Sequence, residues 1–232
     1  MARKGRGSWR LRLAALVLLL ALAGSVAMWW HLRSWQPPRE QWPVQGVEVG
    51  SDDGPVDWTA LKAIGVDFAY IDASASAFAR DSGFAANLEG ARAVGLQVGA
   101  VHEYDPCQPA DRQAANFVTV VPRDAKLLPS AVSLDRLAED CPSKVTEAAV
   151  ESELTTFLNQ VETHTGKPVI LKLGAKFEAR YHVAAAINRN LWLVRTRLEP
   201  DYAGRPWTLW TANSWLRTEA TEKPLRWVAV QR

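Results

Sequence analysis

The sequence has only two cysteines, Cys107 and Cys141, among its 232 residues. No second cysteine and no pair of histidines stands at the spacing of a metal site, so we predict neither a metal nor a cofactor. Because two cysteines in an exported chain usually pair with each other, we expect a Cys107–Cys141 disulfide. It would close a loop of about 35 residues and stabilise the fold by roughly 3 to 4 kcal/mol. A reactive thiol or a metal ligand is the alternative.

Acidic residues are missing from the first 36 residues, which hold six Lys or Arg. The other 196 residues carry the remaining 21 of the 27 basic side chains against all 25 acidic ones, a formal charge of −4. A phosphate-binding surface needs clustered Lys and Arg, and this part of the chain has no basic run. Nucleic-acid binding is therefore not expected.

Charged residues are also absent from the stretch 13–30, whose eighteen residues are mostly Leu, Ala and Val. This is just long enough for a membrane-spanning helix, and the basic residues of 1–12 place that end in the cytoplasm. The small residues of 23–27 resemble a signal-peptidase site, so a cleaved signal is the alternative to a membrane anchor. In both cases the rest of the chain is exported, to the periplasm or the cell exterior. Residues 31–44, with three prolines from Pro37 to Pro43, are predicted to be a short stiff linker.

Residues 45–232 alternate short apolar runs with helix-like segments, the pattern of a parallel sheet with crossover helices. We expect a single α/β domain. Helices are expected at about 84–94, 112–121 and 146–165, and the segments after Leu191 are too short for full helices. The expected strands are 47–49, 68–71, 96–101, 131–134, 169–173, 191–194, 208–210 and 227–230.

Carboxylates occur at the ends of four of these strands, where a parallel α/β barrel places its reactive groups. They are Glu48, Asp72, Glu103 and Asp135. A glycosidase needs one protonated acid for the leaving oxygen and a second group that stabilises an oxocarbenium-like centre. These residues are therefore candidates for glycosidic chemistry, although any one of them alone could be a solvated loop residue or a helix cap.

The order and spacing of several motifs resemble glycoside hydrolase family 25, the muramidases. The resemblance covers most of residues 45–230 and implies a shortened, irregular (β/α) barrel of the TIM-barrel type. It also implies hydrolysis of the β-1,4 bond between N-acetylmuramic acid and N-acetylglucosamine in peptidoglycan. The motifs are Gln45–Val49, Val56–Trp58, Gly65–Ile71, Phe84–Asn87, Gly90–Ala100, Gln113–Phe117, Leu128–Pro129, Gly166–Ile170, Leu191–Val194 and Pro206–Trp210.

The site implied by the resemblance is altered in this chain. The family's strand-one aspartate falls on Glu48, and its Asp-x-Glu pair on strand four falls on Ser133 and Asp135. Asp135 keeps an acid that is one methylene shorter, whereas the hydroxyl of Ser133 cannot stabilise positive charge as a carboxylate does. We expect Asp135 to be the general acid, with Glu48 or Glu103 as the supporting carboxylate.

Five further residues are predicted to contact the glycan. His102 keeps the family's identity, with a structural role as the alternative, and the indole faces of Trp210 and Trp215 suit the stacking of sugar rings. Trp210 is the stronger candidate for packing, and Trp215 for the surface. The predicted substrate-binding residues are His102, Asp72, Ser133, Trp210 and Trp215.

The sequence therefore predicts an exported muramidase that is either anchored to the membrane or secreted. The main alternative is a catalytically impaired homologue that still binds the glycan strands. A structural or partner-binding envelope protein with a vestigial cleft is a third possibility.

Overall fold

The computed structural model describes residues 6–231 and divides into two compact units, Met1–Trp35 and Gln36–Arg232. The first unit contains one helix, α1 (Arg6–Arg33). Its segment Trp9–Arg33 is long and apolar enough to cross a membrane, by length and composition alone. The prediction of a spanning or signal helix over 13–30 is consistent with this finding, and a signal sequence passes the same test.

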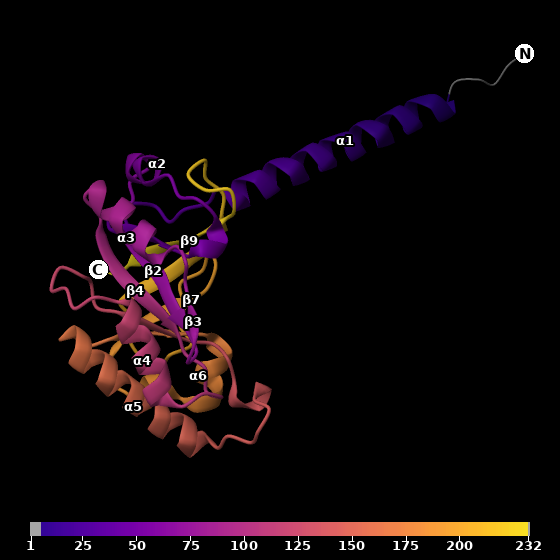
Figure 1. Ribbon diagram of the computed structural model, residues 1–232. Helices are drawn as coiled ribbons and strands as arrows, with labels where there is room; N and C mark the ends of the chain where they lie inside the picture. Colours follow the sequence, from indigo (N-terminus) through magenta and orange to yellow (C-terminus); the bar gives the residue numbers. More distant parts are fainter. Residues whose placement is uncertain (1–5, 232) are drawn as a thin grey trace, which may run out of the picture. The chain divides into compact units, whose positions relative to one another are not determined.

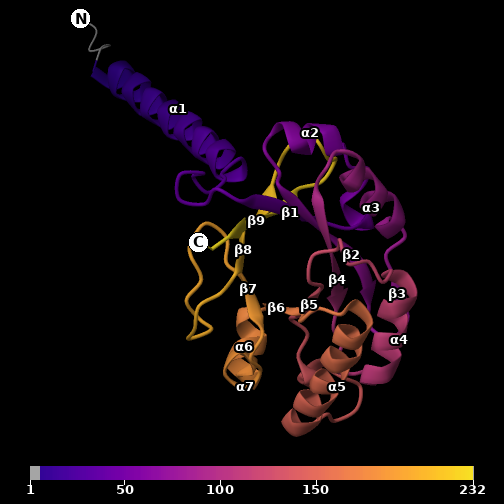
Figure 2. The ribbon, with the colours of Figure 1, turned by 90° about the vertical axis from the view of Figure 1, so that its left-hand side faces the viewer.

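The second unit is a barrel of eight strands, and every strand expected from the sequence is present (Figures 1 and 2). The sheet order is β1-β9-β8-β7-β6-β5-β4-β2, and β1 pairs with β2 to close the circle. A ninth strand, β3, pairs outside the barrel with the end of β2. The strands are β1 (Gln45–Val49), β2 (Phe68–Ala75), β3 (Ala79–Arg80), β4 (Gln97–Glu103), β5 (Ala131–Leu134), β6 (Ile170–Leu173), β7 (Asn190–Val194), β8 (Leu209–Leu216) and β9 (Leu225–Val230).

The barrel departs from the expected parallel sheet at its last strand. β9 runs antiparallel to both β1 and β8, whereas the other neighbouring barrel strands are parallel. The two strands β8 and β9 are joined by a short connection without a crossover helix, and only antiparallel strands can be joined in that way.

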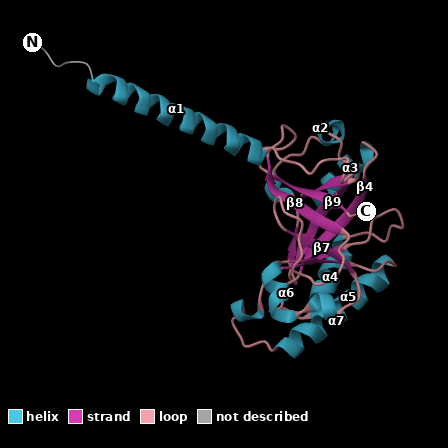
Figure 3. Cartoon of the chain, turned by 180° about the vertical axis from the view of Figure 1, so that it is seen from behind, coloured by secondary structure: helices cyan, strands magenta, loops and turns pink. Residues whose placement is uncertain are grey.

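Helices cover mainly the side of the barrel formed by β2, β4 and β5 (Figure 2), whereas Figure 3 shows that loops cover β8 and β9. The longest, α5, begins after the N-cap Thr146, whose side chain accepts a hydrogen bond from the backbone of Ala149, and ends at Gly166 in the left-handed conformation. These are the start and stop signals expected for 146–165. The helices of the barrel are α2 (Trp58–Ala63), α3 (Phe84–Ala93), α4 (Ala110–Val120), α5 (Glu147–Thr165), α6 (Ala175–Tyr181) and α7 (Val183–Ala186).

The lower half of the barrel interior is apolar and fully packed. Phe68, Tyr70, Val101, Trp192 and their neighbours form a buried cluster across seven strands. A Cβ on Gly99 would collide with the ring of Tyr70, so this glycine allows an aromatic ring to fill the barrel centre. Because side chains alternate along each strand, the next inward positions lie one layer higher, at the carboxyl ends of the parallel strands.

The predicted linker 31–44 does not form a free tether along its whole length. From Gln36 onward the chain belongs to the barrel unit. Trp42 is 8% exposed and stacks on Trp207 with ring centroids 5.6 Å apart. The buried amide of Gln45 donates hydrogen bonds to the carbonyls of Pro37 and Trp42. The prolines of this segment therefore shape a coil that packs on the barrel.

Candidate active site

A polar groove opens at the carboxyl ends of the strands, directly above the apolar cluster. One part has a volume of about 420 Å³, and a second part of about 240 Å³ continues from it. Ser133, Asp135, Lys172 and Arg226 line both parts, so the two form one continuous groove across the barrel mouth. The four predicted carboxylates, Glu48, Asp72, Glu103 and Asp135, all line its larger part.

The carboxylate of Glu48 is held by two cations. Its side chain is 2% exposed, and both oxygens accept hydrogen bonds from Lys172 Nζ, the Oε2 contact being 2.6 Å. Arg226 Nη1 lies 3.9 Å from Glu48 Oε1. Burial raises the pKa of Glu48, but the charges of Lys172 and Arg226 more than offset this, so the pKa is lowered overall. Glu48 is therefore an ionised group in a nearly buried ion pair.

Asp72 lies on the other side of Arg226. Arg226 Nη2 donates to Asp72 Oδ2 at 2.9 Å and to Asp53 Oδ2 at 3.0 Å. Burial, together with the nearby charge of Glu48, raises the pKa of Asp72 to about 7. Glu48 is thus paired with Lys172 and Arg226, and Arg226 also binds Asp72 and Asp53.

Glu103 and Asp135 differ from Glu48 and Asp72 in having no partner for their side chains among the described residues. Both are exposed, and within residues 6–231 neither side chain takes part in a hydrogen bond or an ion pair. Asp135 follows β5 directly, and a Cβ on Gly174 would collide with its Oδ1. The missing side chain at Gly174 leaves room for this carboxylate at the groove wall. Among the four predicted carboxylates, these two remain available to a ligand; Asp52, which also lines the larger part of the groove, is a further exposed carboxylate there.

His102 does not line the groove, because its side chain points from β4 toward the covering helices. It is fully buried and stacks on Phe157 of α5 with ring centroids 4.7 Å apart. Its Nδ1 lies 2.9 Å from Ser74 Oγ, and its Nε2 lies 3.4 Å from Gln113 Oε1. Burial lowers the pKa of His102 to about 4, so the ring is neutral at neutral pH. This placement corresponds to the structural alternative for His102 and not to substrate contact.

Trp210 is also placed away from the groove. It is 2% exposed, packs against Trp42 and Trp207, and its Nε1 donates to the carbonyl of Arg195 at 2.7 Å. The expected sugar platform therefore does not include Trp210. Trp215 is 66% exposed and directly follows Ser214, which lines the smaller part of the groove. Ser133 lines both parts.

Lys172 is the site residue that the sequence analysis missed. It occupies an inward position of β6, two residues after Ile170 of the apolar cluster. A lysine inside an otherwise apolar strand was the available signal, because an inward cation in a closed barrel needs an anionic partner. Arg226, which also lines both parts of the groove, is likewise absent from the predicted site residues.

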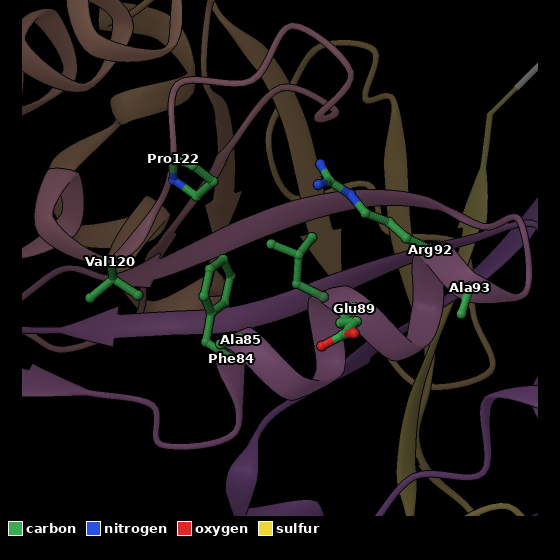
Figure 4. Close-up of a pocket in the computed structure, with 8 residues that line it drawn as sticks. Phe84, Ala85, Glu89, Arg92, Ala93, Val120 and Pro122 are labelled. Atoms are coloured by element: carbon green, nitrogen blue, oxygen red, sulfur yellow. The ribbon is translucent and has the colours of Figure 1, made fainter.

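A cavity that is larger than either part of the groove lies elsewhere in the described chain. It has a volume of about 670 Å³ and lies between α3 and the end of α4, where Phe84 and Arg92 face Val120 and Pro122 (Figure 4). Its lining is mostly apolar and includes Glu89 as its one carboxylate. Glycosidic cleavage uses two carboxyl groups, so this cavity is not a candidate for the chemistry.

The disulfide expected from the sequence is present. Cys107 and Cys141 are bonded, with their Cα atoms 5.3 Å apart. They lie in the loops that follow β4 and β5, the strands that carry Glu103 and lead to Asp135. Arg136 and Asp105, which lie in the same two loops, form an ion pair at 2.9 Å.

Comparison with known proteins gives a consistent result. The uncharacterized protein YegX of Escherichia coli O6:H1 is 27% identical over 176 residues, which cover 72% of this chain and 62% of YegX. The chain thus spans less than two thirds of that relative. Lysozyme M1 of Streptomyces globisporus is 28% identical over 102 residues, covering 42% of this chain and 35% of that protein.

Among solved structures, a family 25 glycosyl hydrolase from Bacillus anthracis superposes with a TM-score of 0.76 at 25% identity. The superposition covers 85% of this chain and 92% of the Bacillus chain. The family model for glycosyl hydrolases family 25 matches residues 47–221, which include every strand from β2 to β8 and the whole polar groove except Arg226. The chain therefore belongs to glycosyl hydrolases family 25.

Proposed function

We propose that this chain is a muramidase that binds the glycan strands of peptidoglycan in the groove at the barrel mouth and cleaves them. The observation that carries the proposal is the open carboxylate of Asp135 at the end of β5, beside a groove that continues to both sides of it. Catalytic groups of α/β barrels lie at this end of the strands. The name of Lysozyme M1 supports the same class of substrate.

In this proposal Asp135 is the general acid. Its carboxyl group protonates the glycosidic oxygen, and the bond between that oxygen and the anomeric carbon breaks. Ser133 lies two residues earlier on the same face, and its hydroxyl can bind a sugar substituent without stabilising positive charge. Glu48 is a poor supporting carboxylate because Lys172 already holds both of its oxygens. We therefore expect turnover to be slow.

The test uses the full chain purified in detergent, incubated with purified peptidoglycan. Release of reducing ends that carry N-acetylmuramic acid is the expected result, and Asp135→Asn should abolish it. The Lys176→Gln variant, altered on α6 outside the groove lining, serves as the control. An Asp135→Asn variant that melts normally and releases reducing ends at the wild-type rate would refute this function.

A glycan-binding protein without turnover is the second candidate. It is favoured by the ion pair between Glu48 and Lys172 and by the hydroxyl at position 133. In this case the full chain would co-sediment with peptidoglycan, no reducing ends would appear, and Asp135→Asn would leave co-sedimentation unchanged. Measuring both binding and release in one experiment therefore separates the two functions.

We further propose that α1 directs the barrel out of the cytoplasm, either as an anchor or as a signal. Its uncharged run over residues 13–30, within the 25-residue candidate span Trp9–Arg33, and the basic residues before residue 13 support export. The substrate proposed for the groove lies outside the cytoplasmic membrane, so the two proposals are mutually consistent.

A further inference from the structure

The proposed muramidase lacks a carboxylate at Ser133, where charge develops during cleavage, and β4 supplies one beside it. Glu103 and Ser133 are register partners on the parallel strands β4 and β5. Partners in a parallel pair point to the same face of the sheet, so Glu103 shares the inward face with Ser133. Both residues line the larger part of the groove.

The position of Glu103 relative to Asp135 suits paired catalytic carboxylates. Neighbouring strands lie about 4.8 Å apart, and two residues along a strand add about 6.6 Å, so the two Cα atoms are about 8 Å apart. Flexible side chains on one face can then place their carboxyl groups within the range of about 5 to 9.5 Å that glycosidases use. Glu103 needs no backbone change to reach this arrangement.

The charge state of the groove also favours Glu103 over Glu48 and Asp72. Lys172 and Arg226 bind Glu48, and Arg226 binds Asp72, so those carboxylates already have cationic partners. Glu103 has no hydrogen bond or ion pair among the side chains of residues 6–231. A carboxylate that is free in the empty groove can interact fully with positive charge that forms on a bound sugar.

We propose that Glu103 supplies the carboxylate that position 133 lacks, and thus that the second catalytic group has moved from β5 to β4. This inference rests on the proposed muramidase function. As Asp135 protonates the leaving oxygen, the electron pair of the breaking bond goes to that oxygen, and Glu103 stabilises the cationic anomeric carbon. Water then adds to this carbon and gives its proton to the Asp135 carboxylate, which restores the acid.

The first test compares Glu103→Gln with wild type in the release of reducing ends from peptidoglycan. Loss of a stabilising charge of this kind costs about 10²- to 10³-fold in kcat, and we expect a fall in that range. The matched control is Glu89→Gln, which removes the same charge from α3 outside the groove and should stay within about twofold of wild type. Thermal melting of each variant verifies that it is folded.

The second test moves the carboxylate back. The double variant Glu103→Gln, Ser133→Asp restores a charge on the same face of the neighbouring strand and should regain most of the lost rate. In Glu103→Ala, added azide should restore turnover and yield a glycosyl azide, because a small anion can occupy the vacated position. A residue with only a structural role would give neither rescue.

The outcomes distinguish the inference from the function on which it rests. If wild type releases no reducing ends, the proposed hydrolysis fails. If wild type is active and Glu103→Gln is equally active, only the assignment of Glu103 is overturned. The assignment would also be overturned by a failure of both rescues. In that case Glu103→Gln is slow, Ser133→Asp does not restore its rate, and azide does not restore the rate of Glu103→Ala.

Discussion

At the scale of single residues, Lys172 determines the electrostatics of the groove. Its side chain is 11% exposed and faces a glutamate that is 2% exposed. Removing one partner of such a pair leaves an uncompensated charge, at a cost of about 3 to 5 kcal/mol. We expect Lys172→Met to lower the free energy of unfolding by this amount in chemical denaturation. The double variant Glu48→Gln, Lys172→Met should recover most of the loss. If the double variant is as unstable as Lys172→Met alone, the loss does not come from the unpaired charge of Glu48.

His102 gives a second prediction at this scale, concerning acid stability. Its pKa is about 4 in the folded chain against about 6.5 in the unfolded chain, so the unfolded state binds more protons between these values. The stability contributed by the neutral ring is present above pH 6.5 and is lost as the pH falls from 6.5 to 4, by up to about 3 kcal/mol. His102→Gln should reduce this dependence.

The measurement for His102 is the free energy of unfolding at several pH values for wild type and His102→Gln. Asp72 acts in the opposite direction, since its pKa of about 7 makes the folded state lose stability as the pH rises from about 4 to 7. Both proteins contain Asp72, so subtracting their free energies of unfolding at each pH cancels its contribution. Parallel pH curves would show that His102 is not the acid-sensitive group.

The strand-end carboxylates of the groove could be predicted from the sequence, but their pairing could not. Glu48, Asp72, Glu103 and Asp135 end parallel strands, and all four line the groove as expected. The partners Lys172 and Arg226 come from strands far along the chain, and Arg226 lies on the antiparallel β9, where the strand-end rule does not apply. His102 was misplaced because alternation puts it on the opposite face from Val101 and Glu103.

At the scale of elements, local signals were sufficient for α5 and for the eight barrel strands, because caps and apolar runs act within a few residues. The direction of β9 depends on which strands it pairs with, namely β1 and β8. The hydrophobic pattern along the sequence does not contain that information. β3 was missed because it has only two residues and both are exposed.

The disulfide gives the prediction at this scale. Cys107–Cys141 links the loops after β4 and β5, with a separation of 34 residues. Replacing both cysteines by serine should lower the free energy of unfolding by about 3 to 4 kcal/mol, because the unfolded chain gains the entropy of an open loop. Urea denaturation of the oxidised protein and of the Cys107→Ser, Cys141→Ser variant measures the difference. A loss below about 1 kcal/mol would mean that the ion pair of Arg136 with Asp105 already fixes these loops.

At the scale of the whole molecule, we expect α1 to remain part of the mature protein as an anchor. The apolar segment Trp9–Arg33 exceeds the roughly 20 residues that a membrane-spanning helix needs. Fractionation of expressing cells should recover the full-length protein with the membranes, resistant to extraction by high salt. A soluble product whose sequence starts at Met28 would favour the cleaved-signal alternative. Trypsin added to intact spheroplasts should degrade the barrel if it lies outside.

The position of β9 between β1 and β8 determines when this barrel can be completed during folding. Arg226 reaches the carbonyl of Glu48 across a separation of 178 residues, so the circle closes only through a contact of very high sequence separation. Such contacts form slowly, because the entropy of a long loop must be overcome first. Until then β1 and β8 each have an unpaired edge that can bind another strand. A chain that folds from its N-terminal side would therefore form β4 and β5, which carry Glu103 and lead to Asp135, early, and would complete its groove last, when β9 with Arg226 closes the ring.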